Sequence, residues 1–278
     1  MTVVGRSLAR TTGVSALWRN RSTMGTLIQR DLAVKYQRSM LGYLWSLIEP
    51  MGLAAIYWFI FGVLFGSHGH GVSQAQYPLF LVTGIFAWQW ASSAMSESTN
   101  ALTSQSALIT TMRVPREIFP VAKVFARFAE FAAGLPVILL FAIVFDGDFG
   151  WYLFALPLAI VLQVTLLVGI AFILSSVNVL MRDVERFMRL VMRILFYAAP
   201  TIYPLGRVIE AESMPHWAKL VYQANPFVGI IQLQHGAWLP QQLPNPWLLG
   251  YTAGFSLLLL FIGWWIFRKL EPKVLKEL

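Results

Sequence analysis

The feature that most constrains the fold is a series of long apolar segments that carry very few charges. The clearest of them runs from Phe149 to Met181 without one Asp, Glu, Lys or Arg. A helix needs about 20 mainly apolar residues to cross a bilayer, and this segment exceeds that length. Of the 278 residues, 57% are hydrophobic and 12% are charged, and the mean hydropathy is +0.63. The sequence therefore predicts an integral membrane protein.

Six segments are read as membrane spans, which predicts an all-α membrane protein with a single transmembrane domain over residues 1–278. The predicted spans are about 43–66, 78–96, 121–145, 152–180, 187–204 and 243–267. The fifth has Arg189 and Arg193 near its start and Pro200 and Pro204 near its end, so we expect it to be short or broken. Six crossings return both termini to the same side.

The distribution of basic residues predicts which side that is. Of the 21 Lys and Arg, all except Arg207 and Lys219 lie before the first span, around the second and fourth connections, or in the C-terminal tail. Basic residues beside spans favour the cytoplasm, so both termini of this multi-pass protein are predicted to lie on the cytoplasmic side of the cytoplasmic membrane. The net charge of +8 then reflects topology, and no nucleic-acid partner is expected. The chain has no Cys, which excludes disulfides.

The external connection 205–242, between the fifth and sixth spans, is too long for a simple turn and too apolar for an ordinary exposed loop. Pro215 and Pro226 interrupt it, which predicts two short helices. Its apolar residues, including the run from Phe227 to Ile231, favour a return toward the bilayer. We expect these re-entrant helices to act as an external gate.

Residues 23–42 are predicted to form an amphipathic helix at the membrane interface, because the larger apolar residues at 27, 28, 32, 36, 40 and 41 share one helical face. Arg30, Lys35 and Arg38 fall largely off that face. They either meet an anionic partner at the cytoplasmic surface or only anchor the helix among lipids, and both readings stay open. Just inside the first span, Glu49 is the only charge and Pro50 removes a helical hydrogen bond, which predicts a kink there. Glu49 either has a structural or gating role or lies among the lipid headgroups, and both readings stay open.

Several short motifs follow one another in order along the chain. They are Arg30–Asp31, Lys35–Tyr36, Ser39, Leu41–Gly42, Trp45 and Pro50, then RVPREIFP at 113–120, NVLMRD at 178–183, APTIYP at 199–204 and NPF at 225–227. In this order the chain resembles the ABC-2 type polysaccharide export permeases over nearly all of its length after residue 25. One departure concerns the segment Gln232–His235, where many relatives carry an Arg shortly after the Asn-Pro pair. No role of that Arg is carried over.

The resemblance implies a membrane subunit of an ATP-driven exporter that moves a lipid-diphosphate-linked polysaccharide of O-antigen or galactan type. Within the family the chain looks most like the mycobacterial-type branch associated with cell-wall galactan. The resemblance also implies a homodimer that works among membrane lipids with two copies of a separate ATPase subunit. The chain itself has no GxxxxGK phosphate loop, so ATP and Mg are expected in the partner, and this chain is not expected to be an enzyme.

The resemblance also assigns a coupling helix, which docks on the ATPase, to the connection between spans two and three. Residues 110–117 are predicted to form it, with Pro115 near its start. Without the resemblance, this segment reads as an ordinary basic loop. The predicted coupling residues are Thr110, Met112, Arg113, Val114, Pro115, Arg116 and Glu117.

Two further sets of residues are predicted to meet the substrate. Arg30, Lys35 and Arg38 are expected to receive the lipid diphosphate, because guanidinium and ammonium groups bind phosphate oxygens. Aromatic rings pack on the C–H faces of sugars and are expected to line a glycan path, although each one also fits an aromatic belt at the membrane surface. The predicted path residues are Tyr57, Trp58, Trp88, Trp90, Tyr197 and Tyr203.

Other functions stay open on the sequence alone. A membrane-embedded glycosyl- or prenyl-phosphate transferase needs a cytoplasmic carboxylate cluster, which the sequence lacks. An ATP-independent flippase would more often show internal repeats and intramembrane ion-coupling charges, for which only Glu49 and Glu130 are candidates. An ABC-2 exporter of drugs or small lipids shares the same architecture.

Three remaining patterns have ordinary readings. His68-Gly69-His70 reads as a flexible loop and Asp146-Gly147-Asp148 as a turn, so no metal site is expected. GxxxG motifs occur at Gly62–Gly66 and Gly250–Gly254, and such small residues let helices approach closely. We expect both motifs to serve packing within one subunit.

Overall fold

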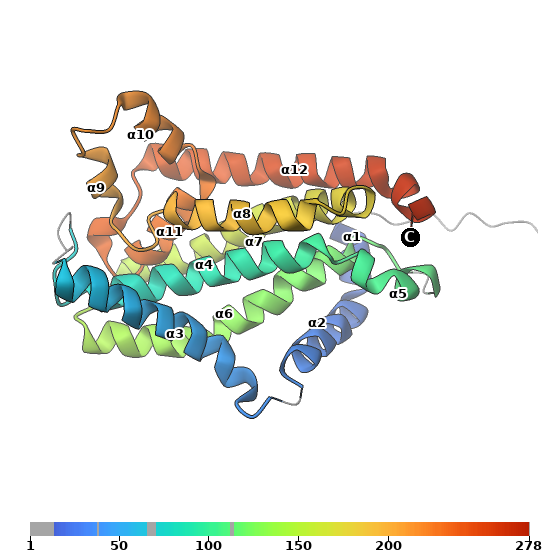
Figure 1. Ribbon diagram of the computed structural model, residues 1–278, viewed down its shortest axis with the longest axis horizontal. Helices are drawn as coiled ribbons and strands as arrows, with labels where there is room; N and C mark the ends of the chain where they lie inside the picture. The colour runs from blue at the N-terminus through green and yellow to red at the C-terminus, as the bar shows by residue number, and fades with distance from the viewer. Residues whose placement is uncertain (1–13, 38, 66–70, 112–113, 278) are drawn as a thin grey trace, which may run out of the picture.

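The computed structural model describes residues 14–37, 39–65, 71–111 and 114–277, and the described chain is a helical bundle without β-strands (Figure 1). By length and composition, four helical segments can cross a membrane. They are Gly42–Leu64, α6 (Ile118–Val144), Trp151–Leu180 and α12 (Pro246–Glu277). The first joins η1 (Gly42–Leu44), α3 (Trp45–Tyr57) and the π-helical η2 (Trp58–Leu64), and the third joins η4 (Trp151–Phe154) to α7 (Ala155–Leu180).

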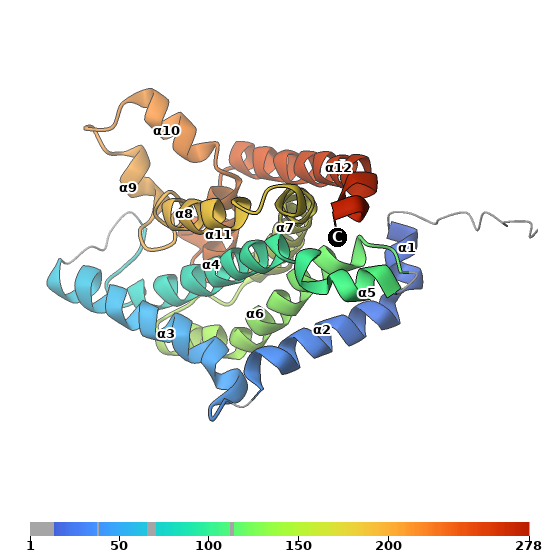
Figure 2. The same cartoon turned by 45° about the vertical axis from the view of Figure 1, so that its right-hand side comes forward.

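The remaining helices are shorter or more polar. They are α1 (Val14–Arg19), α2 (Arg21–Tyr36), α4 (Tyr77–Thr99), η3 (Thr103–Gln105), α5 (Ser106–Thr111), α8 (Val184–Tyr197), α9 (Leu205–Ile209), α10 (His216–Gln223), α11 (Pro226–Gly236) and η5 (Pro240–Gln242). Figures 1 and 2 place α1, α5 and the C-terminal end of α12 at one end of the bundle, while α9 and α10 project at the other.

The predicted second and fifth spans correspond to α4 and α8, which are not among the four apolar helices. Helix α4 is long enough, with 23 residues, but it ends in a polar stretch around Ser96 and Glu97. Helix α8 has 14 residues, roughly 21 Å, and is shorter than a hydrocarbon core of about 30 Å. The chain leaves the helix at Ala198, two residues before Pro200. A proline disfavours helical geometry in the residue before it, so a short fifth element follows from the sequence.

The helix predicted for residues 23–42 is α2, and it ends six residues early, at Tyr36. Gln37 takes an extended conformation, and Gly42 has φ +50°, which favours glycine. The chain therefore turns before the membrane helix begins. Met40 and Leu41 lie beyond the end of α2 and are exposed, so the apolar stripe of α2 stops at Tyr36. Farther along, Pro50 lies inside α3, which continues past it to Tyr57.

Helices α7 and α12 make the most extensive contact in the bundle. Their backbones touch at Gly169 and Gly263, where a Cβ on Gly263 would lie 2.1 Å from the Gly169 carbonyl oxygen. The GxxxG motif of α12 does not take part, because a Cβ on Gly250 or Gly254 would meet nothing within 4 Å. The expectation that this motif packs within the subunit is therefore wrong. Gly66 of the other motif lies outside the described residues.

Helix α11 lies in the interior, against α4, α7 and α12. It begins as its sequence dictates, because the Asn225 side chain accepts a hydrogen bond from the Phe227 N–H and Pro226 occupies the first turn. All residues from Phe227 to Gly236 are buried. Within Gln232–His235, His235 Nε2 lies 3.0 Å from the Phe80 carbonyl oxygen on α4.

Candidate functional site

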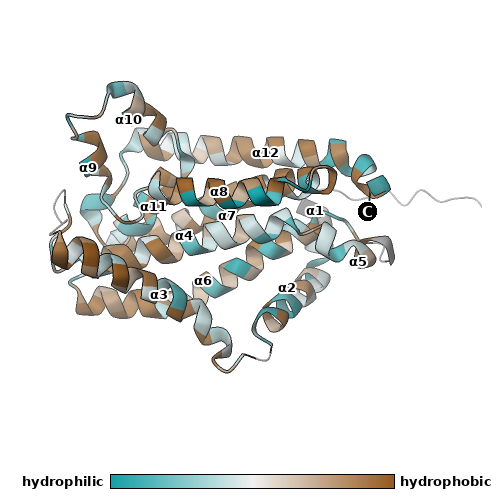
Figure 3. Ribbon diagram, viewed as in Figure 1, coloured by the Kyte–Doolittle hydropathy of each residue, from teal (hydrophilic) through white to brown (hydrophobic). Residues whose placement is uncertain are grey.

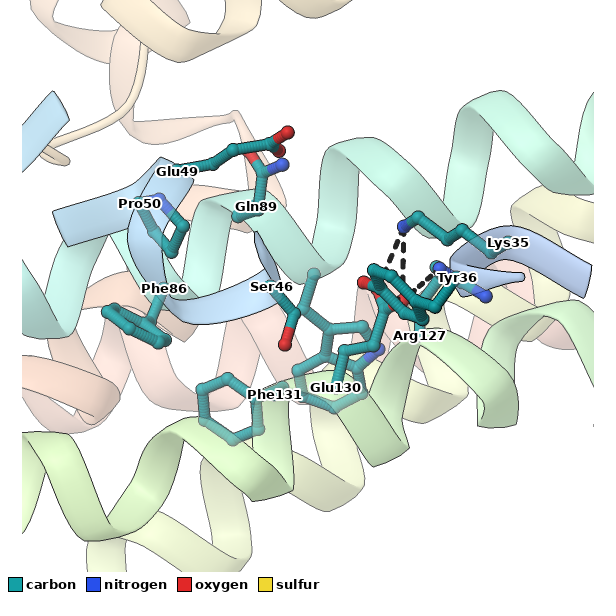
Figure 4. A pocket seen from close by; sticks show the side chains of 11 residues that line it. Lys35, Tyr36, Ser46, Glu49, Pro50, Phe86, Gln89, Arg127, Glu130 and Phe131 are labelled. Atoms are coloured by element: carbon teal, nitrogen blue, oxygen red, sulfur yellow. Dashed lines mark hydrogen bonds and ion pairs between the residues drawn. The ribbon is translucent and has the colours of Figure 1, made fainter. Parts of the chain in front are cut away.

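A cluster of polar and charged side chains joins α2, α4 and α6, and Figure 4 shows its members Lys35, Tyr36, Arg127 and Glu130. We call it the α2 cluster, and it consists of Lys35, Tyr36, Glu97, Arg127 and Glu130. Lys35 Nζ lies 3.1 Å from the Glu130 carboxylate, and the Tyr36 hydroxyl donates to the same carboxylate at 2.6 Å. Arg127 pairs with both Glu130 and Glu97. The cluster thus holds the C-terminal end of α2 against the third and fourth turns of α6.

Arg127 is the most deeply placed member, with only 1% of its side chain exposed. A buried guanidinium is costly unless its charge and donors are matched. Glu97 lies 3.2 Å from Arg127 Nε, and Glu130 accepts from Arg127 Nη1. Removing either carboxylate would leave the buried Arg127 guanidinium with one acidic partner fewer. Both acids therefore stabilise the fold.

Tyr36 is held in its protonated form. Burial, together with the hydrogen bond to Glu130, raises the pKa of the Tyr36 hydroxyl above its ordinary value. The hydroxyl therefore donates to the carboxylate throughout the physiological pH range. This neutral donor lets Glu130 serve three side chains at once.

A second ion pair lies one turn earlier along α2. Lys123 Nζ of α6 lies 2.8 Å from the Asp31 carboxylate, and Arg30 lies 3.6 Å from it. The two layers together fasten α2 along α6. Of the three residues predicted to receive a diphosphate, Lys35 is already paired with acids, Arg30 keeps 38% of its side chain exposed, and Arg38 lies outside the described residues.

The α2 cluster borders a small polar cavity of about 30 Å³. Its lining includes Glu49 and Pro50 of α3, which the sequence analysis singled out, and Figure 4 shows the Glu49 side chain beside Gln89. A cavity of this size holds about one water molecule. A wider and more open depression of about 300 Å³ adjoins it, lined by Lys35, Tyr36, Ser39, Trp45 and Glu49.

Three of the predicted path residues lie together where α3 meets α8. The Tyr57 and Tyr197 hydroxyls are 3.4 Å apart, and the ring of Phe196 packs against both Tyr57 and Trp88. From there the Tyr203 hydroxyl donates to the Tyr197 carbonyl. Tyr222 of α10 donates in turn to the Tyr203 hydroxyl at 3.3 Å. We call Tyr57, Tyr197, Tyr203 and Tyr222 the tyrosine row.

The other predicted path residues do not join this row. Trp90 is 2% exposed and packs between Phe128 and Phe131 of α6. Trp88 is 6% exposed and contacts Phe196 and Phe227, which are not members of the row. Trp58 borders a separate apolar cavity of about 200 Å³ between α3, α4 and α6. Tyr222 was missed by the sequence analysis, because a tyrosine within an external segment carries no signal that tells it from a surface residue.

The segment predicted to couple to an ATPase differs in shape from the expectation. Helix α5 covers Ser106–Thr111, so Thr110 is helical, whereas Val114 to Glu117 form a turn and Met112 and Arg113 lie outside the described residues. Pro115 lacks an N–H and disfavours helical geometry in Val114, so the next helix, α6, begins only at Ile118.

The turn at 114–117 forms ion pairs with the C-terminal part of α12. Arg116 Nη1 lies 2.6 Å from Glu271 Oε1, and Arg268 lies 3.6 Å from Glu117. The sequence analysis did not select Arg268 or Glu271, because a charged residue that follows the last span reads as an ordinary cytoplasmic end. The sequence did offer one signal. Arg268 and Glu271 are three residues apart, and on a helix this spacing places both on one face, where they can pair with each other or with a shared partner.

No group of three or more His, Cys, Asp or Glu in the described ranges is placed to hold a metal ion. The hydrophobic surface around the site is extensive, and Figure 3 shows α3 as largely apolar, with hydrophilic residues gathered on α2 and at the end of α12.

Comparison with known proteins adds independent information. A family model described as "ABC-2 type transporter" matches residues 23–235. The O-antigen export system permease protein RfbA of Klebsiella pneumoniae is 30% identical over 88% of this chain and 90% of its own length. The protein of the same name from Myxococcus xanthus is 25% identical over 92% of this chain and 95% of its own. The polysialic acid transport protein KpsM of Escherichia coli is 24% identical over 91% of this chain and 95% of its own.

The family match covers more than half of the chain, and the likeness to these permeases runs through nearly all of it. The motifs before the first span, the helical bundle and its apolar surface agree with that match. This chain belongs to the ABC-2 type transporter family.

Proposed function

We propose that this chain is the membrane permease subunit of an ATP-driven exporter that moves a lipid-linked polysaccharide across the cytoplasmic membrane. The observation that carries the proposal is its likeness, over nearly the full length of both chains, to proteins named as O-antigen export permeases. A protein named for polysialic acid transport matches over a similar length. The four apolar helices supply the membrane domain that such a function requires.

The proposed topology has six crossings with both termini in the cytoplasm. Helix α4 makes the second crossing as an interior helix that the other helices shield from lipid, so it can be less apolar than they are. Helix α8 and the residues up to Pro204 make the fifth, shorter crossing. The bundle supports an even number of crossings, because α1 and the end of α12 lie at the same end (Figure 1).

The proposed assembly is two copies of this chain with two copies of a separate ATPase subunit, which binds ATP and Mg. The chain lacks a GxxxxGK phosphate loop, so ATP acts through the partner. Helix α5 and the turn at 114–117 lie at the same end of the bundle as α1 and the end of α12, on the face that the proposed topology turns to the cytoplasm. We assign this segment to ATPase docking.

The proposed substrate route has two parts. The lipid diphosphate meets Arg30 and Arg38, with Lys35 joining once its pairing with Glu130 is exchanged for phosphate. The glycan passes the tyrosine row, whose hydroxyls and ring faces suit sugar hydroxyls and C–H faces. Helices α9, α10 and α11 form the external gate, and a galactan-type polymer is the proposed cargo.

The experiment that tests the proposal is purification of this chain with its ATPase, followed by ATP hydrolysis measured with added ligands. Lipid-linked polysaccharide is expected to stimulate hydrolysis several-fold, and the same carrier lipid without glycan is expected to do so far less. Equal stimulation by both would point to a small-lipid exporter. No association with an ATPase would contradict the proposal altogether.

A further inference from the structure

Four charged side chains connect the turn at 114–117 with the last turns of α12. Glu271 uses both carboxylate oxygens, one 2.6 Å from Arg116 Nη1 and the other 3.2 Å from Arg268 Nη1. Arg268 in turn lies 3.6 Å from the Glu117 carboxylate. Two acids and two bases thus form a chain of ion pairs without net charge, which we call the α12 bridge.

The α12 bridge is shielded from water. The exposed fractions of its side chains are 17% for Arg116, 14% for Glu271, 29% for Arg268 and 4% for Glu117. Ion pairs that are partly buried are screened less by salt than surface pairs. Removing one partner also leaves the other charge buried, which is strongly unfavourable. We therefore expect each ion pair of the bridge to be stronger than the exposed pair Glu185–Arg189 within α8. The side chains of that pair are 43% and 55% exposed.

Helix α12 is suited to carry movement away from the bridge. It is continuous for 32 residues, roughly 48 Å at 1.5 Å per residue. Its backbone is in direct contact with that of α7 at Gly263 and Gly169. Nearer its N-terminal end, Thr252 packs on Gly229 of α11, where a Cβ on the glycine would lie 2.1 Å from the Thr252 hydroxyl oxygen.

We propose that Arg268 and Glu271 are positioning residues for ATPase coupling: through the α12 bridge they make α12, with α7, follow any displacement of residues 114–117. Movement at the docking segment then reaches α11 at the other end of the bundle through α12, in addition to any movement passed on by α6, which begins directly after the turn. This inference rests on the proposed function, because it needs an ATPase that acts on the 106–117 segment.

The test uses the complete exporter with its ATPase and compares Glu271→Arg, the exchanged pair Arg116→Glu/Glu271→Arg, and Glu271→Gln. Glu271→Arg is expected to lower polysaccharide export at least tenfold while the ATPase still co-purifies and hydrolyses ATP. The exchanged pair is expected to recover most of the export. Glu271→Gln, which keeps the shape and removes the charge, is expected to fall between the two. The matched control is Glu185→Arg, which breaks an exposed pair and is expected to export normally.

Movement is measured directly with spin labels, which is simple because the native chain has no Cys. Labels at Leu275→Cys on α12 and Val34→Cys on α2 occupy exposed positions. ATP is expected to change the distance between them in the otherwise unaltered protein and in the exchanged pair. It is not expected to change that distance in Glu271→Arg.

Three results would overturn the proposal. They are normal export by Glu271→Arg, failure of an assembled exchanged pair to recover, and a label distance that ATP does not alter in the otherwise unaltered protein. Failure of the proposed function is distinguishable, since the unaltered exporter would then move no polysaccharide while the label distances still report coupling.

Discussion

Helices α3 and α4 are neighbours that meet opposite surroundings. Only 17% of the apolar window in Gly42–Leu64 is buried, and residues such as Ile56 and Phe59 are more than half exposed. In α4, every residue from Tyr77 to Trp88 is buried. Yet α3 belongs to one of the four apolar segments, and α4 does not.

The difference shows that apolar character in a membrane protein does not report burial. Lipid is as apolar as a protein core, so a helix that faces lipid must be apolar along its outer side. A helix that faces other helices is free to carry polar groups if these find partners. Glu97 of α4 does so by pairing with Arg127.

The largest expected effect comes from crowding α4. A Cβ on Gly84 would lie 2.5 Å from the Thr201 carbonyl oxygen and 2.7 Å from His235 Nε2, so Gly84→Leu forces backbone apart. We expect the free energy of unfolding to fall by at least about 5 kcal/mol, because the new side chain meets backbone that cannot move aside, and thermal or denaturant unfolding in detergent measures it. On α3, a Cβ on Gly52 meets nothing within 4 Å, so Gly52→Ala is expected to be neutral or slightly stabilising. Equal losses in both variants would show that α3 is packed as tightly as α4.

The next largest change in the free energy of unfolding is expected at Trp90, and Trp58 serves as its comparison. Trp90→Ala empties a buried site between Phe128 and Phe131 and is expected to cost about 3 to 5 kcal/mol in the free energy of unfolding. Trp58 is 44% exposed, so Trp58→Ala is expected to cost less than half as much. The same unfolding measurement checks both. If Trp90→Ala unfolds like the native protein, the interior placement of α4 is wrong.

The smallest effect on stability is expected in the tyrosine row. Tyr57→Phe and Tyr197→Phe each remove one hydroxyl from the 3.4 Å contact and are expected to change the unfolding free energy by less than about 0.5 kcal/mol. If the row meets sugar hydroxyls, each change should lower the export rate about 2- to 10-fold, as expected for about 0.5 to 1.5 kcal/mol of hydrogen bonding.

The matched control for the row is Tyr251→Phe on α12, which removes a hydroxyl that donates to the Ala224 carbonyl at the end of α10. Tyr251 lies outside the row, so its export rate is expected to stay near that of the native protein. Loss of export in this variant alone, with Tyr57→Phe and Tyr197→Phe unaffected, would assign the glycan path to a different surface.

Much of the fold follows from local sequence. The long apolar segments predict α3, α6, α7 and α12, and Asn225-Pro226 predicts the start of α11, because membrane length and helix capping act on neighbouring residues. The predicted helix at 110–117 was displaced to Ser106–Thr111, since the effect of Pro115 on the residue before it outweighed its preference for a first turn.

The contacts between distant residues could not be predicted in the same way. Lys35 pairs with Glu130, and Gly169 meets Gly263, although nothing near any of these residues indicates its partner. The conspicuous GxxxG motif of α12 faces open space instead. Such pairings depend on how the helices cross, which several weak preferences decide together.

The central claim is that this chain exports a lipid-linked polysaccharide only together with an ATPase. The most direct measurement reconstitutes both subunits in liposomes and follows the transfer of a fluorescent lipid-linked polysaccharide across the bilayer. Transfer is expected to require both subunits and hydrolysable ATP, and to stop with a non-hydrolysable analogue. Transfer at the same rate by this chain alone, without ATP, would contradict the claim and identify an ATP-independent flippase.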